Sequence, residues 1–134
     1  MPAAKIFLDT NILVYFATDS EPEKRDVSAD LLKSRPLIGV QVLNEFINVM
    51  RNKLRVGWAG LRPNLEIFDK ACSVEALTPA IQARAAWIAE RHRYHIYDAN
   101  IIAAAEASGA EILYSEDLED GRRFGKLKIV DPYV

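Results

Sequence analysis

Four acidic residues stand beside short apolar runs, where an isolated ionised carboxylate is unfavourable. Asp9 follows the run IFL, Asp98 follows HIY, Asp117 follows ILYSE, and Glu45 lies within LNEF. Carboxylates that are brought together repel one another and raise one another's pKa values unless a cation neutralises them. Hard divalent ions such as Mg²⁺ prefer oxygen ligands, so these four side chains are candidate metal ligands if the fold unites them.

Each of these acids also has a simpler explanation when it is taken alone. Asp9, Asp98 or Asp117 could each cap the N-terminus of a helix, which stabilises a protein by about 1 kcal/mol. Glu45 could be a solvated glutamate on a helix surface. These alternatives stay open for each single residue, and the metal hypothesis depends on all four lying together.

The elements that must position these acids alternate along the chain. The sequence patterns predict strands at residues 5–8, 37–40, 74–77, 111–114 and 127–130, and helices at 11–17, 23–34, 41–55, 61–72, 79–93 and 98–108. Strands that alternate with helices favour an α/β fold, a three-layer α/β/α sandwich with a mainly parallel central sheet. The length suits a single domain over residues 1–134.

A parallel sheet predicts where these four acids lie relative to one another. Ligands bind outside the carboxyl ends of the strands in such sheets. Asp9 ends the first predicted strand and Asp117 comes just after the fourth, while Asp98 begins a helix and Glu45 lies one turn into another. We therefore expect all four carboxylates at the same edge of the sheet, where they would hold a metal ion.

Composition describes a folded chain, with 50% hydrophobic and 27% charged residues. No apolar stretch approaches the roughly 20 residues that span a bilayer, and the N-terminus lacks signal-peptide features, so we expect a cytoplasmic protein without membrane contact. The net charge of −2 argues at first against a nucleic-acid partner. If four of the 19 acidic residues hold metal, however, the 17 basic residues outnumber the remaining 15 acidic ones, and a basic surface is available for nucleic acid.

For the other reactive or aromatic side chains, a structural role is the favoured interpretation. Cys72 is the single cysteine, so it can form no disulfide within the chain, and we expect it to be a small helix residue. For His92 and His95 a surface or helix-end position is favoured over catalysis. For Tyr94 and Tyr97 core packing is favoured over stacking on bases.

The segments FLDTNILVY, LNEF, YDANIIAAA and ILYSEDLEDG resemble the four acidic signatures of PIN-domain ribonucleases, in particular VapC-type toxins. The resemblance covers nearly the whole chain, in order and at fitting spacing. It implies a catalytic cluster of Asp9, Glu45, Asp98 and Asp117, in which the three aspartates bind metal. It also implies supporting positions at Thr10, Asn11, Ser115 and Glu116.

The resemblance implies a metal-dependent endoribonuclease that is the toxin of a type II toxin-antitoxin pair. Mg²⁺ or Mn²⁺ would be the cofactor, RNA the substrate, and an antitoxin protein and a second copy of the chain the partners. The residues suggest which cations could contact RNA phosphates, although helix-end cations have an equal alternative in the helix dipole. These candidates are Arg51, Arg55, Arg93, Arg122 and Arg123.

Two other classes remain as alternatives from the residues. One is an acidic-pocket α/β domain that binds Mg²⁺ for signalling, as receiver domains do, although no second acid is paired with Asp9. The other is a phosphatase with a nucleophilic aspartate, although that class has a second aspartate where this chain has Asn11.

Overall fold

The computed structural model describes residues 3–134 and builds one six-stranded sheet with helices on both faces. The strands are β1 (Ile6–Leu8), β2 (Leu37–Gly39), β3 (Ser73–Glu75), β4 (Ile112–Tyr114), β5 (Arg123–Phe124) and β6 (Leu127–Val130). The helices are α1 (Thr10–Ala17), α2 (Pro22–Leu32), α3 (Val40–Asn48), α4 (Trp58–Ala71), α5 (Pro79–His92) and α6 (Ile96–Ala107). One turn of π-helix, η1 (Val49–Lys53), extends α3.

The sheet runs in the order β3-β2-β1-β4-β6-β5, and every neighbouring pair is parallel except β5 with β6. β1 and β4 are far apart in sequence but adjacent in space, with Leu8 opposite Tyr114. The predicted α/β fold with a mainly parallel sheet is therefore confirmed. β5 was not predicted, because a two-residue strand is too short to show an alternating pattern.

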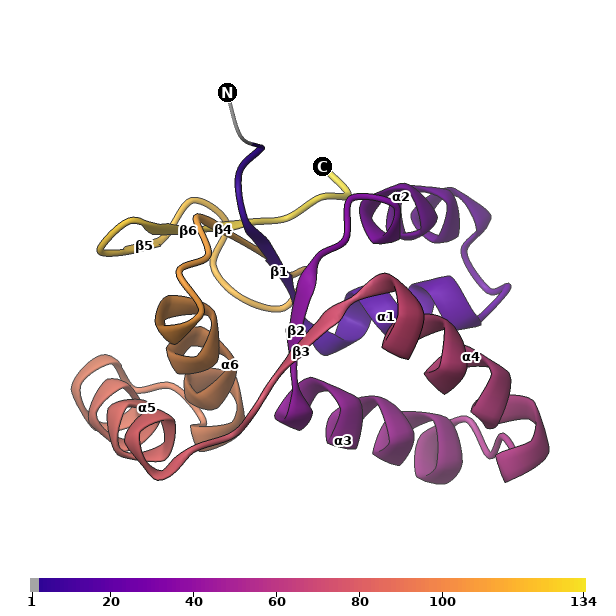
Figure 1. The fold of residues 1–134 in the computed structure, drawn as a ribbon, viewed down its shortest axis with the longest axis horizontal. Helices are drawn as coiled ribbons and strands as arrows, with labels where there is room; N and C mark the ends of the chain where they lie inside the picture. Colours follow the sequence, from indigo (N-terminus) through magenta and orange to yellow (C-terminus); the bar gives the residue numbers. More distant parts are fainter. Residues whose placement is uncertain (1–2) are drawn as a thin grey trace.

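The helices form two layers around the sheet. Figure 1 shows α5 and α6 on one side of the strands and α1 to α4 on the other, as the three-layer prediction requires. The core between these layers contains the fully buried rings of Phe7, Phe46 and Phe68. In α6 the whole run from Ala99 to Ala105 is buried, so this helix lies against the sheet and beneath α5.

Several predicted boundaries are wrong in an informative way. The helix expected at residues 41–55 is α3 followed by the π-turn η1, in which the Leu54 N–H reaches the Val49 carbonyl oxygen. Its apolar residues continue without a break, so the change of winding leaves no trace in the sequence pattern. The next helix, predicted at residues 61–72, begins earlier, as α4 (Trp58–Ala71).

The chain contains no membrane-spanning candidate in the part that the structure describes, because none of its helices there is both long and apolar enough.

Candidate functional site

The four candidate carboxylates line one cavity of about 420 Å³ at the carboxyl edge of the sheet. Asp9 leaves the end of β1 and Asp117 follows the end of β4, so the parallel pairing of these strands brings them together. Glu45 reaches the cavity from α3 and Asp98 from the first turn of α6. We call this cavity the acidic pocket. The convergence expected from the strand ends is present, although its use for metal stays a prediction.

Helix capping explains only one of the aspartates. Asp9 is the N-cap of α1, and its Oδ1 accepts a hydrogen bond of 2.6 Å from the Thr10 N–H. Asp98 is not a cap, because His95 fills that position and its Nδ1 accepts the Tyr97 N–H at 3.1 Å. Asp117 caps nothing, since no helix begins after it in the described chain. The capping alternative is therefore wrong for Asp98 and Asp117.

Neutral donors hold three of these carboxylates in place. The buried Ser115 hydroxyl donates to Asp9 Oδ2 at 2.7 Å, and Thr10 donates to Glu45 Oε2 at 3.1 Å. The Asn11 side chain donates to Asp117 Oδ2 at 3.0 Å, while its own oxygen accepts the Glu116 N–H at 3.3 Å. Polar residues beside the acids thus fix their orientation without neutralising their charge.

Burial in the pocket raises the pKa values of Asp9, Glu45 and Asp98. Burial raises the pKa of Asp9 to about 6, and the nearby charges of Asp98 and Asp117 add to it, although hydrogen bonds from Ser115 and Thr10 act in the opposite direction. Burial likewise raises the pKa of Glu45 to about 7, with the Thr10 hydrogen bond opposing.

Burial is also the main reason why the pKa of Asp98 lies above its ordinary value. The charge of His95 opposes this shift, and the charge of Asp117 adds to it. These acids are therefore desolvated without a paired cation, which is the situation that a bound divalent ion would relieve.

The chemistry of the donors fits a hard divalent ion, because every candidate ligand is a carboxylate oxygen. Within residues 3–134, however, no three side chains of His, Cys, Asp or Glu lie close enough to form a ready-made metal site. The hydrogen bonds from Thr10, Asn11 and Ser115 account for this, since they hold the carboxylates at separate points on the wall. Joint ligation of one ion would need rotation of these side chains.

Glu116 lines the same pocket but has a different environment. Its carboxylate forms an ion pair with Lys24 of α2 and accepts a hydrogen bond of 2.6 Å from the Tyr15 hydroxyl. Burial opposes ionisation here, but the hydrogen bonds from Lys24 and Tyr15 lower the pKa of Glu116 overall. Glu116 is thus neutralised by the protein itself.

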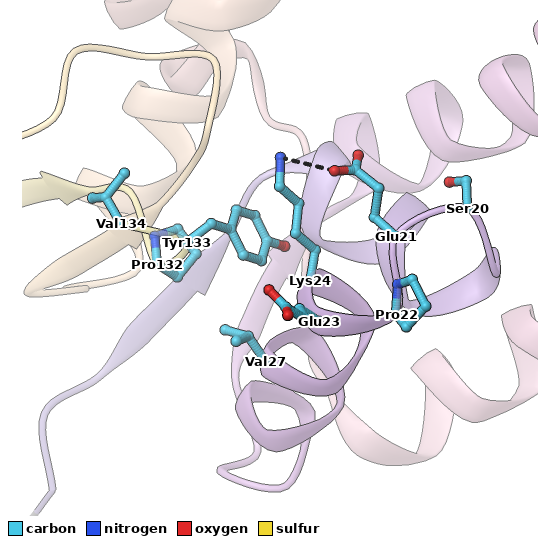
Figure 2. Close-up of a pocket in the computed structure, with 9 residues that line it drawn as sticks. All are labelled: Ser20, Glu21, Pro22, Glu23, Lys24, Val27, Pro132, Tyr133 and Val134. Carbon is cyan, nitrogen blue, oxygen red and sulfur yellow. Dashed lines mark ion pairs between the residues drawn. The ribbon is translucent and has the colours of Figure 1, made fainter.

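Aromatic rings complete this environment. The Lys24 ammonium lies 4.8 Å from the ring centre of Tyr15 and 5.4 Å from that of Tyr133, and Figure 2 shows it between Tyr133 and Glu21. We call Tyr15, Lys24, Glu116 and Tyr133 the lysine cluster. Sequence reasoning missed it, because Lys24 and Glu116 are 92 positions apart and no local pattern connects them.

The candidate RNA-binding arginines lie outside the acidic pocket. Arg51 stacks over Trp58 at 5.0 Å, and Arg122 pairs with Glu119 and stacks over the rings of Tyr94 and Phe124. Arg55, Arg93 and Arg123 are exposed, the first two in the left-handed backbone region. One basic side chain among the described residues does line the pocket, and it is Lys53 of η1.

The remaining candidates divide between the core and the surface. Cys72 is not in a helix as predicted but forms the C-cap of α4; it is buried, and burial raises its pKa to about 11, which disfavours the reactive thiolate. Tyr94 packs against Phe124, as predicted. Tyr97 contradicts the prediction of core packing, because it is 55% exposed and lines the acidic pocket. Its position next to Asp98, at the first turn of a helix that starts at the sheet edge, is the signal that could have revealed this.

Known structures share this fold. A VapC20 toxin of Mycobacterium tuberculosis, described as cleaving the sarcin-ricin loop, superposes with a TM-score of 0.70 at 21% identity over 84% of this chain and 90% of its own. A toxin-antitoxin complex from Klebsiella pneumoniae gives 0.69 at 19% identity, covering 96% of this chain and 98% of that one. DNA-bound VapBC from Salmonella typhimurium gives 0.67 at 22% identity, covering 97% and 99%.

At these identities the structural matches show a shared fold. No curated protein sequence matches the chain. The family model of the PIN domain matches residues 6–126, a span that contains all four pocket acids. The chain therefore belongs to the PIN domain family.

Proposed function

We propose that this protein is a metal-dependent endoribonuclease, a single nuclease domain that acts in the cytoplasm as the toxin of a type II toxin-antitoxin pair. Membership of the PIN domain family supports the nuclease activity. The similarity of its fold to VapC20 and to toxin-antitoxin complexes supports the role as a toxin. The observation that carries the proposal is the acidic pocket, in which the described structure provides carboxylates without a paired cation.

Asp9, Asp98 and Asp117 are the residues that would hold Mg²⁺ or Mn²⁺. When bound, such an ion supplies positive charge that polarises the phosphate and makes a water molecule more acidic. Ser115 orients Asp9 through its hydrogen bond, and Asn11 orients Asp117. These hydrogen bonds set the resting orientation of both aspartates, from which their side chains would rotate to share one ion.

Glu45 is placed to move a proton. Its Oε2 is occupied by the Thr10 hydroxyl, which leaves Oε1 to accept a proton from the attacking water. Burial raises its pKa to about 7 in the metal-free pocket, and a carboxylate in this range can take up a proton near neutral pH. We propose this role for Glu45 beside the three ligand aspartates.

The alternatives of a receiver-like domain and an aspartate-nucleophile phosphatase are disfavoured. A phosphatase of that class has a second aspartate two residues after the nucleophile, and this chain has Asn11 at that position. The match to the PIN domain family supports the nuclease instead.

We also propose two protein partners. The negative charge of the pocket is complementary to a basic segment of an antitoxin, which would occupy the pocket and block it. We further propose a homodimer, as the resemblance to VapC-type toxins implies. Light scattering across micromolar concentrations tests the dimer, and a mass equal to one chain would contradict it.

The activity is tested by paired substitutions that make the same chemical change. Asp98→Asn removes a charge from the pocket, and Asp26→Asn removes one from the exposed surface of α2. We expect Mg²⁺-dependent cleavage of structured RNA to fall by about 100-fold or more in Asp98→Asn, as losses of several kcal/mol do. Asp26→Asn should cleave like the wild type. Equal cleavage by both variants, with the fold confirmed by circular dichroism, would refute the proposed site.

A further inference from the structure

Tyr97 is an exposed aromatic residue on the wall of the acidic pocket. It lies in the first turn of α6, next to Asp98, and is 55% exposed. The ring of His95 lies 4.8 Å from its own at an interplanar angle of 59°. α6 thus begins with an aromatic pair at the pocket and continues as a helix whose central residues are all buried.

The other highly exposed aromatics differ from Tyr97 in what covers them. Trp58 lies under the guanidinium of Arg51 at 5.0 Å, and Trp87 under that of Arg84 at 4.5 Å. No lysine or arginine covers Tyr97 within the described chain, and neither tryptophan lines the acidic pocket. His95 contacts the Tyr97 ring, but the side chain stays 55% exposed, which leaves ring surface to which a ligand could bind.

Lys53 approaches the same pocket from η1. It ends the π-turn, is exposed, and forms no ion pair with any residue of 3–134. A short π-turn inside a helix is often found at functional sites, and here it ends at a pocket residue.

We propose that Tyr97 and Lys53 position the RNA substrate at the acidic pocket, with one unpaired base stacked on the ring of Tyr97 and a phosphate bound by the ammonium of Lys53. This inference rests on the proposed nuclease function. A cavity of about 420 Å³ is in the size range of sites for small molecules, roughly 300–1,000 Å³.

This arrangement selects a class of RNA. In a duplex both faces of each base are covered by its neighbours, so only an unstacked base can meet an aromatic side chain. Stacking accepts any base, while a lysine binds phosphate without reading sequence. The Tyr97 contact therefore needs the unstacked base of a loop or single strand, and base identity must be read elsewhere.

The first test measures stacking by fluorescence, in chelator so that no RNA is cleaved. A hairpin RNA carries 2-aminopurine in its loop, and the probe is quenched when its base stacks on a ring. Tyr97→Ala should lose the quenching and weaken binding by roughly 10-fold, within the range measured for base–aromatic stacking. Tyr97→Phe keeps the ring and should match the wild type, as should the remote control Trp87→Ala.

The second test separates the phosphate contact from stacking. Lys53→Gln should retain the quenching, and the slope of log affinity against log salt should become shallower by about 0.7, the value for one phosphate contact on a single strand. The same RNA sequence annealed into a duplex should bind more weakly than the hairpin loop, and Tyr97→Ala should not change its affinity.

The outcomes distinguish this inference from the proposed function. If the wild type cleaves the hairpin with Mg²⁺ but Tyr97→Ala binds and quenches like the wild type, the inference is wrong and the nuclease stands. If duplex RNA binds as well as the loop, the selected class is wrong. If the wild type neither binds nor cleaves any RNA, the proposed function itself fails. Thermal melting of each variant confirms that it is folded.

Discussion

The acidic pocket and the lysine cluster share a wall but treat their carboxylates in opposite ways. Asp9 receives hydrogen bonds from neutral donors, and burial raises its pKa to about 6. Glu116 receives an ion pair from Lys24, and its pKa is lowered. The sequence places Glu116 directly beside Asp117, yet the fold neutralises the first and leaves the second without a cation. Proximity in sequence thus does not define which acids are prepared for a metal ion.

The largest expected difference between the two regions is in activity. Asp117→Asn removes a charge from the acidic pocket, and cleavage of RNA with Mg²⁺ should fall by about 100-fold or more. Glu116→Gln makes the matched change in the lysine cluster, and cleavage should fall by less than about 10-fold. The comparison is measured as kcat/KM on the same RNA. A loss in Glu116→Gln as large as in Asp117→Asn would show that Glu116 belongs to the functional acids.

A smaller difference is expected in the response of stability to metal. Mg²⁺ or Mn²⁺ at about 100 times its Kd should stabilise the wild type by about 2.7 kcal/mol and raise its thermal midpoint. Asp98→Asn should weaken this response and raise the midpoint without metal, because it removes one repelling charge. Glu116→Gln should respond like the wild type. The midpoint is followed by circular dichroism with and without chelator. An unchanged midpoint in saturating metal would argue against an ion in the acidic pocket.

The smallest expected effect is in the pH dependence of stability without metal, and its sign differs between the regions. Asp9 and Glu45 bind protons more tightly when folded, so their contribution is fully present below pH ~4 and is lost as the pH rises through about 6 to 7. Glu116 has a lowered pKa, so its contribution is present above pH ~4.5 and is lost as the pH falls.

Urea unfolding at several pH values in chelator measures these two slopes. Glu116→Gln should flatten the loss of stability at low pH and leave the slope between pH ~4 and ~7 unchanged. Asp98→Asn should make the upper slope shallower, because the charge of Asp98 contributes to the shifts of Asp9 and Glu45. A wild-type stability that rises steadily from pH ~4 to ~7 would contradict the raised pKa values of the pocket.

The sequence was informative about the candidate acids that come directly after the ends of strands. Alternating strands and helices predicted a parallel sheet, and the pairing of β1 with β4 then explains why Asp9 and Asp117 meet. The cap of α6 was misassigned, because His95 as well as Asp98 carries an acceptor near the start of that helix. Only the path of the backbone shows which of these two side chains accepts a hydrogen bond from a free N–H in the first turn.

Long-range contacts between polar side chains lay beyond sequence reasoning. The ion pair of Lys24 with Glu116 and the exposure of Tyr97 both depend on how α2 and α6 pack against distant segments. Periodicity reports which face of a helix is buried, but it does not report which surface residue a distant loop will approach. The candidate acids could be predicted from the sequence because the carboxyl ends of parallel strands lie at the same edge of the sheet.

The pairing of β1 with β4 also has a consequence in time. During synthesis Asp9 is made early, but it meets Asp117 only after β4 has been translated and has paired with β1. The Ser115 N–H then reaches the Val130 carbonyl oxygen on β6, which is translated after all four acids. A nascent chain therefore has no complete acidic pocket until β4 and β6 have been translated and β4 has paired with both β1 and β6. If the finished protein cuts RNA, a partly made chain cannot yet cut the messenger from which it is read.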